Sequence, residues 1–199
     1  HRFERLTELA TSEVRTLPSA LDRLGRHLQI ASLQQQRGVA DSARESRADA
    51  RQILENAIRE DLAPEPRLAG WISLAELSRE AQDSPESRQA CDQAQALLLS
   101  LEPTTLRVPY VRSLAIEVRQ SHGDAAAVDL YCRAAEWASA IEGLRKRRTA
   151  YLAIAERLVD LNQVEKAAEV IRRETEADWR AQALITLAGG YVQFSYGVR

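Results

Sequence analysis

The sequence is poor in the residue types that build sheets and membrane spans. Aromatic residues make up 5% of its 199 residues, and it contains only 8 Gly and 6 Pro. Ala and Leu, which favour helices, are abundant instead, so the composition predicts an all-α protein with essentially no sheet. No apolar stretch approaches the roughly 20 residues that a membrane-spanning helix needs, and residues 1–30 have no signal-peptide core. We therefore expect no membrane partner.

Cysteine and net charge are also scarce. Cys91 and Cys132 are the only cysteines, and we expect two buried, reduced thiols and no disulfide. The formal net charge is -2, which gives no global positive field that would attract nucleic acid or an anionic membrane. These features predict a cytoplasmic protein. Because the chain starts at His1 and contains no Met, removal of a leader stays open as an alternative.

Side chains that could carry catalysis or hold a metal are few and isolated. The His residues are His1, His27 and His122, and no pair has a zinc-site spacing such as H-E-x-x-H. Ser121, His122 and Asp124 are neighbours in a predicted turn, which does not make a catalytic triad. The sequence has no Gly-rich phosphate loop and no G-x-S-x-G motif. We therefore expect no enzymatic activity, no metal site and no cofactor.

What the sequence does contain is an Ala that returns in one fixed context. Each such Ala directly follows Ile or Leu, lies eight residues after an Arg, and recurs about every 40 residues. The Ala positions are Ala31, Ala75, Ala115, Ala155 and Ala188, and the Arg positions are Arg23, Arg67, Arg107, Arg147 and Arg180. Repetition on this scale predicts a stacked array of helical units.

Turn signals divide each repeat into two helices. A break such as Gly38 or Gly123 follows the repeated Ala, and a second break such as Gly143 separates one repeat from the next. The second helices have apolar residues at helical spacing, so that each buries one face. We predict one domain over 1–199, made of a capping helix at 1–17, hairpin repeats at 18–62, 63–103, 104–143 and 144–177, and a partial repeat with a tail at 178–199.

Two breaks also carry the spacing of a helix-capping pair. Asp83 is followed three residues later by Glu86, and Asn162 is followed in the same way by Glu165. In such a pair the first side chain accepts a hydrogen bond from the backbone of the first turn. Pro85 fits the first turn of the helix that Asp83 would begin.

The order of large and small residues in the repeats matches a known pattern. In the second repeat Trp71 is followed by Leu74 and Ala75 on the first helix, and then by Cys91 and Ala94 on the second. The same register starts at His27, Val111 and Tyr151 in the other repeats. This pattern resembles the tetratricopeptide repeat in a divergent form, with a period near 40 instead of about 34 residues. Arg47 and Glu174 stand where the family has apolar or small residues.

The resemblance implies a right-handed α-α superhelix, or solenoid, of about four and a half helical hairpins whose first helices line a concave face. Chaperone-binding members of the family hold a terminal carboxylate there with Lys and Asn, and neither residue is present at the corresponding positions of this chain. We expect a mixed polar groove for an extended or helical peptide, although each residue could also belong to an ordinary solvated face. The implied groove residues are Ser32, Gln35, Glu76, Arg79, Arg112, Arg119 and Glu156.

Three sets of residues have alternative interpretations. The repeated Arg could form a ladder for acidic peptides, but pairing with an acidic residue shortly before each Arg is the simpler interpretation. Those acidic residues are Asp22, Glu60 or Asp61, Glu102, Glu142 and Glu176. The basic run 145–148 could attract phosphate or an acidic partner, or be a solvated linker. Trp71 is expected in the core, whereas Trp137 and Trp179 lie near repeat junctions and could be interface anchors.

The function we expect is that of a non-catalytic scaffold of tetratricopeptide-like repeats that binds a protein or peptide. One alternative is a structural module that self-associates, or packs on the rest of a larger protein, through the open C-terminal helix. That alternative allows a homo-oligomer. A helical-repeat RNA binder is the third class, and the slight acidity of the chain disfavours it.

Overall fold

The computed structural model describes residues 2–101 and 107–196, and all regular structure in these ranges is α-helical. The all-α prediction is thereby confirmed for these residues, and none of their helices is long and apolar enough to cross a membrane. The described chain falls into two compact units, His1–Leu101 and Glu102–Arg199. The helices are α1 (Arg2–Arg15), α2 (Ala20–Gln36), α3 (Ala40–Glu55), α4 (Pro64–Glu80), α5 (Ser84–Ser100), α6 (Arg107–His122), α7 (Asp124–Ser139), α8 (Leu144–Asp160), α9 (Val164–Arg172) and α10 (Ala177–Tyr196).

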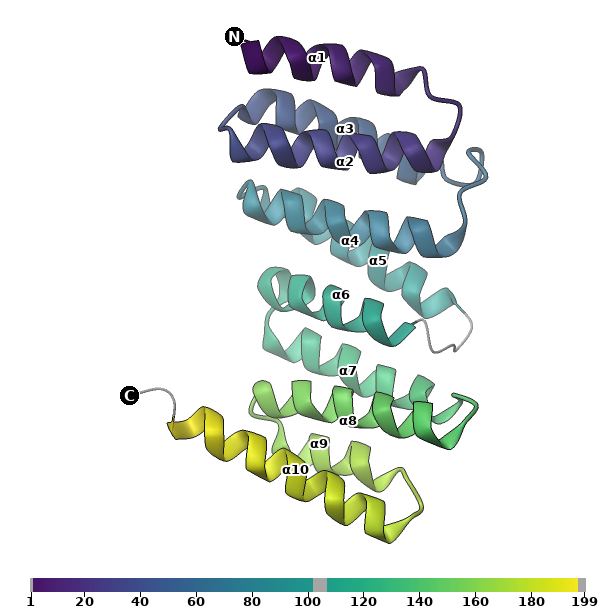
Figure 1. The fold of residues 1–199 in the computed structure, drawn as a ribbon, viewed down its shortest axis with the longest axis vertical. Helices are drawn as coiled ribbons and strands as arrows, with labels where there is room; N and C mark the ends of the chain where they lie inside the picture. Colours follow the sequence, from purple (N-terminus) through teal and green to yellow (C-terminus); the bar gives the residue numbers. More distant parts are fainter. Residues whose placement is uncertain (1, 102–106, 197–199) are drawn as a thin grey trace. The chain divides into compact units, whose positions relative to one another are not determined.

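The first unit contains two helical hairpins and the helix that precedes them. Helix α2 packs on α3, α4 packs on α5, and α1 packs on α2, with α2 and α4 side by side in front of α3 and α5 (Figure 1). Leu24, Leu54 and Leu68 are at most 2% exposed and form part of its core. A Cβ atom added at Gly70 would lie 2.8 Å from Leu54 Cδ2 and 2.9 Å from Leu24 Cδ2. The missing side chain therefore lets α4 approach both helices of the first hairpin closely.

The second unit repeats this arrangement with α6 packed on α7 and α8 packed on α9. Helix α7 also contacts α8, and α10 packs on both helices of the preceding hairpin (Figure 1). Leu114, Tyr151, Ile154 and Leu158 are at most 2% exposed and belong to the core of this unit. The predicted hairpins are thus present as consecutive packed helix pairs in both units.

The repeated Ala marks the buried face of each first helix. Ala31, Ala75, Ala115 and Ala155 are at most 2% exposed. A small side chain at this point allows the helix backbones to approach closely, and a larger one would overpack the core. Ala188 of α10 is exposed, because no second helix follows α10 in the described part of the chain.

The turns inside the hairpins share a left-handed residue. Gly38, Gln82, Gly123 and Asn162 all have a positive φ, between 57° and 91°. Glycine adopts this conformation without steric strain, whereas other residues do so at a cost of about 1 kcal/mol. Gly38, Gln82 and Asn162 each stand one residue before the N-cap of the next helix, whereas Gly123 is itself the N-cap of α7. Three of the four turns therefore place the left-handed residue at the same position.

The two predicted capping pairs have different outcomes. Asp83 is the N-cap of α5 and accepts a hydrogen bond from the Glu86 backbone N–H at 3.3 Å, with Pro85 in the first turn. This prediction is confirmed. The prediction for Asn162 is wrong, because Asn162 occupies the left-handed position of the turn and Gln163 is the N-cap of α9.

The cysteines lie on second helices of hairpins in different units. Cys91 of α5 is buried, Cys132 of α7 is half-buried, and neither forms a disulfide. Burial raises the pKa of the Cys132 thiol. The two reduced cysteines agree with the prediction from sequence, except that Cys132 is not fully buried.

We predict opposite effects of the same substitution at two glycines of the first hairpin. Neither Gly25 nor Gly38 has an atom within 4 Å of where a Cβ would lie, but Gly38 has a φ of +75°. Gly38→Ala should lower the free energy of unfolding by about 1 kcal/mol, because Ala strains the left-handed turn. Gly25→Ala should raise it by about 0.5 kcal/mol, because Gly25 lies inside α2. Urea unfolding followed by circular dichroism measures both, and equal effects would contradict this account of the turn.

Candidate functional site

One cavity on the first helices of the second unit lies between α6 and α8. This α6–α8 hollow has a volume of about 630 Å³. Its walls are exposed faces of the two helices, where residues spaced by three or four positions lie side by side. The lining residues are Val111, Arg112, Ser113 and Ile116 of α6, Tyr131 of α7, and Ala153, Ile154, Glu156 and Arg157 of α8.

The floor of the hollow is apolar and its rim is charged. Val111, Tyr131 and Ile154 are at most 5% exposed, whereas Ile116 on the wall is 50% exposed. Burial raises the pKa of the Tyr131 phenol, although Arg157 and Arg112 act in the opposite direction. The hollow therefore offers apolar surface and positive charge to the same ligand, which is the usual composition of a binding cleft.

The two arginines of the rim differ in how they are held. Arg157 Nη1 lies 2.8 Å from Asp160 Oδ2 on the same helix. Arg112 is exposed and forms no ion pair with any carboxylate of the described residues. Arg112 is thus the guanidinium that is available to a carboxylate of a ligand.

The structure brings together some of the predicted groove residues and not others. Arg112 and Glu156 both line the α6–α8 hollow. Arg119 lies further along α6, where its Nε donates to Asp124 Oδ1 at 2.6 Å across the α6–α7 turn. Tyr131, which forms the floor, was missed because the repeat pattern assigns it to the core.

The other four predicted groove residues belong to the first unit, and their relation to the hollow is not defined. Ser32 and Gln35 lie on α2, and Glu76 and Arg79 lie on α4. Gln35 lines a second cavity of about 300 Å³ at the turns of the two hairpins. A single groove made of all seven residues stays a prediction.

Beside that second cavity, a buried ion pair joins the second helices of the first unit. Arg47 of α3 is 3% exposed, and its Nε donates to Glu86 Oε2 of α5 at 2.9 Å. Ser78 of α4 donates to the same oxygen at 2.8 Å, and Asp83 lies 3.8 Å from Arg47 Nη2. Arg47 departs from the tetratricopeptide pattern, and this pair gives the physical reason why a charge is tolerated there.

Three of the repeated Arg residues, Arg23, Arg147 and Arg180, make structural contacts, but not with the acidic residues nearest in sequence, and Arg67 Nε is buried without a hydrogen-bond partner. Arg23 bonds to Glu60 and to the Leu17 carbonyl, which joins the start of α2 to the segment after α3. Arg147 lies 3.4 Å from Glu174, at the end of the same hairpin. The expected partners Asp22 and Glu142 are therefore replaced by residues that are distant in sequence. The side chain of Arg107 and all of Glu102 lie outside the described residues.

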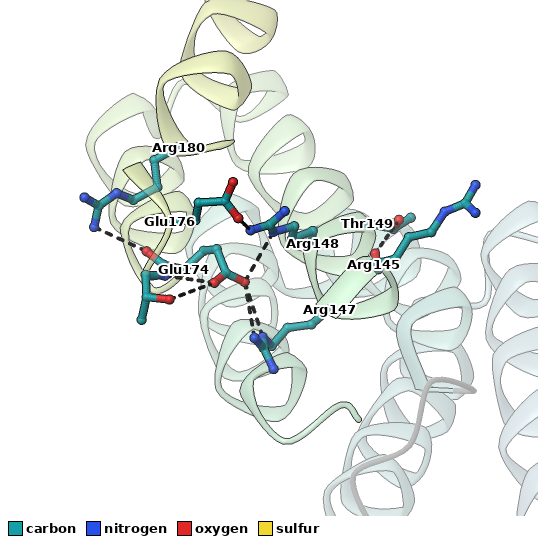
Figure 2. A network of polar contacts seen from close by, with 8 residues as sticks. Arg145, Arg147, Arg148, Thr149, Glu174, Glu176 and Arg180 are labelled. Carbon is teal, nitrogen blue, oxygen red and sulfur yellow. Dashed lines mark hydrogen bonds and ion pairs between the residues drawn. The ribbon is translucent and has the colours of Figure 1, made fainter. Parts of the chain in front are cut away.

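Glu174 is the centre of a polar network at the α9–α10 turn (Figure 2). It is 2% exposed, and Arg147 and Arg148 approach its Oε2 while Arg180 donates to its backbone carbonyl at 3.3 Å. Burial alone would raise the pKa of its carboxyl, but hydrogen bonds from Thr175 and the two arginines lower it on balance. Glu174, which like Arg47 departs from the repeat pattern, is thus also paired with side chains of opposite charge.

His27 occupies the bulky core position of the first hairpin and is 1% exposed. Its Nδ1 forms no hydrogen bond and lies 3.7 Å from Asp49 Oδ2, which accepts a hydrogen bond from Arg15 Nη2 at 2.7 Å. Burial lowers the pKa of His27 below its ordinary value of 6.5; Asp49 opposes this shift, and Arg15 and Arg23 add to it. The neutral imidazole is therefore the form that fits the folded protein.

No protein-family model matches the chain, and no curated protein matches it in sequence. The resemblance to the tetratricopeptide repeat therefore rests on the residue pattern and on the packing of consecutive helix pairs. Within residues 2–101 and 107–196, no three His, Cys, Asp or Glu side chains come together as metal ligands would.

We predict that the Arg47 pair contributes more to stability than an exposed pair on the same helix. Arg47→Ala leaves the buried Glu86 carboxylate without its partner and should lower the free energy of unfolding by about 3 kcal/mol. Arg51→Ala removes an exposed pair with Glu55 and should change it by about 0.5 kcal/mol. Urea unfolding of the two variants provides the comparison. An equal loss of the free energy of unfolding would contradict a larger contribution from the buried pair.

We also predict that stability falls on acidification because of His27. The folded protein protonates His27 less readily than the unfolded chain does. The stability that neutral His27 contributes is therefore full above about pH 6.5 and is lost as the pH falls below that value. The free energy of unfolding should therefore decrease between about pH 7.5 and 5.5, a range in which unperturbed carboxyl groups stay ionised. His27→Phe should flatten this slope. An unchanged slope in the variant would contradict the assignment to His27.

Proposed function

We propose that the chain is a non-catalytic scaffold that binds a segment of another protein in the α6–α8 hollow. The observation that carries the proposal is the combination of Ile116, exposed on the wall, with Arg112, which has no carboxylate partner in the described part of the chain. An exposed apolar side chain beside an open cation is suited to a peptide with apolar and acidic groups. The partner proposed here is a protein or peptide, and no cofactor is involved.

We further infer that the helix pairs form a right-handed, tetratricopeptide-like superhelix and that the protein is cytoplasmic. The repeated Ala, the left-handed residue before the N-cap in three inner turns and the packing of consecutive pairs support the first inference. Two cysteines that are not joined in a disulfide support the second. In such a superhelix, α6 and α8 would be first helices of adjacent repeats and would face the concave side.

A second candidate function is self-association through the C-terminal helix. An apolar cavity of about 310 Å³ lies between α8, α9 and α10, and its lining contains no charged residue. The lining residues are Val159, Val164, Ala167, Ala168, Leu184, Leu187 and Ala188. Such a surface could pack on a second copy or on another part of a larger protein. An RNA-binding function has no comparable support, since the net charge is -2.

The proposed binding site can be tested with a displayed library of random peptides selected on the folded chain. We predict that selected peptides bind the wild-type chain about tenfold more tightly than the Ile116→Glu variant, because the substitution places a charge on the apolar wall. Fluorescence anisotropy measures the affinities. Ile185→Glu is the matched control, since Ile185 is 65% exposed on α10 and does not line the hollow.

Failure to select any peptide, or equal loss of binding in both variants, would contradict the proposed site. Sedimentation equilibrium of the wild-type chain separates the two candidate functions, because self-association makes the mass depend on concentration. A constant monomeric mass together with peptides that require Ile116 would support the scaffold. A concentration-dependent mass that Leu184→Glu abolishes would instead support the self-associating module.

A further inference from the structure

A second hollow lies on the opposite flank of α8, against α10. This α8–α10 hollow has a volume of about 450 Å³. Its apolar surface comes from Leu144, which is 45% exposed, and from the half-buried Leu152 and Trp179. The complete lining is Leu144, Arg145, Arg148, Thr149, Leu152 and Trp179. Trp179 is therefore partly exposed at a surface, as its interpretation as an interface anchor requires.

The Trp179 ring is held in place by its neighbours. The guanidinium carbon of Arg148 lies 5.4 Å from the ring centroid, which is the geometry of a cation-π contact. Arg148 itself is paired with Glu176 and lies 3.7 Å from Glu174. A fixed aromatic surface loses little conformational entropy when a ligand binds, and this makes Trp179 a suitable anchor.

The basic run 145–148 divides into paired and unpaired charges. Arg147 and Arg148 face Glu174 and Glu176, whereas the Arg145 side chain points away from this network (Figure 2). Arg145 and Lys146 are exposed, and no carboxylate of the described residues forms an ion pair with them. The run lies in the first turns of α8, so these residues belong to a helix and not to a linker.

The positive charges of Arg145 and Lys146 lie at the end of α8 where positive charge is unfavourable. Arg145 and Lys146 are in the first turn of α8, which has no acidic residue and no side-chain N-cap bond. Positive charge at a helix N-terminus is unfavourable by some tenths of a kcal/mol. Residues that reduce stability without a compensating contact in the folded chain point to a role in binding.

The two hollows lie on different sides of α8, and both are lined by apolar residues and arginines. Leu152 lines the α8–α10 hollow, and its neighbour Ala153 lines the α6–α8 hollow. The α8–α10 lining contains two arginines and no acidic residue, and the α6–α8 lining contains two arginines and one glutamate. Arg148 and Arg157 are paired with carboxylates outside the linings, so Arg145 in one hollow and Arg112 in the other are the arginines without an ion pair among the described residues.

We propose that the α8–α10 hollow is an interaction surface for an acidic protein segment that places a large apolar side chain against Trp179 and a carboxylate against Arg145, which lines the hollow. Lys146, the next residue of the first turn, adds positive charge beside it. The proposal rests on the scaffold function, since it extends the peptide site across α8. The apolar contact supplies affinity, and the charges supply selectivity for acidic sequences and a dependence on salt.

The peptide library described above provides the test. Selected peptides should be rich in Asp and Glu and contain Trp, Phe or Leu, and they should bind the Arg145→Glu, Lys146→Glu variant about tenfold more weakly than the wild type. Thermal unfolding of this variant should be unchanged or shifted to higher temperature, because acidic residues suit the first turn of a helix. Trp179→Ala should weaken the same peptides.

The matched control is the variant with Arg88→Glu and Arg172→Glu, which has the same change in net charge on exposed residues of α5 and α9. It should bind like the wild type. Peptides that need Ile116 but bind the two charge-reversal variants equally would overturn this inference and leave the scaffold function intact. Enrichment of basic or uncharged peptides would also overturn it. Failure to select any peptide would overturn both proposals.

Discussion

Close approach between helices at the repeated Ala is the constraint on which the rest of the structure depends. Four of the five alanines are essentially inaccessible, and the neighbouring Leu or Ile side chains fill the space beside them. Each hairpin has an apolar face that it cannot bury alone, so neighbouring hairpins within each unit pack on one another. The absence of a side chain at Gly70 serves the same purpose between the first two hairpins.

Charged residues enter the buried interfaces where the repeat pattern is interrupted. Arg47 and Glu174 replace apolar or small residues, and each is compensated by oppositely charged side chains of a neighbouring segment. Because an unpaired buried charge is strongly destabilising, each substitution fixes the position of its partner. The same paired charges at the α9–α10 turn hold Trp179, so the packing of the hairpin and the proposed binding surface share residues.

The helices and their pairing could be predicted from sequence because their signals are local. Gly38, Gly123 and Asp83 mark turns and caps within a few residues of the helices that they end or begin. The partners of Arg23 and Arg147 could not be predicted, since they lie 37 and 27 residues away along the chain. Arg112 and Glu156 were placed on a common surface from the repeat register. Tyr131 and the α8–α10 hollow were missed because they depend on how neighbouring hairpins pack.

Glu174 connects the α8–α9 hairpin to helix α10. Its carboxylate receives Arg147 and Arg148 from the hairpin that it ends, and its backbone carbonyl receives Arg180 from the helix that follows. Folding of α10 is thereby coupled to folding of the α8–α9 hairpin through one residue. Coupling of this kind determines how far local unfolding spreads between packed helices. This turn is thus a point at which local unfolding of α10 is transmitted to the α8–α9 hairpin.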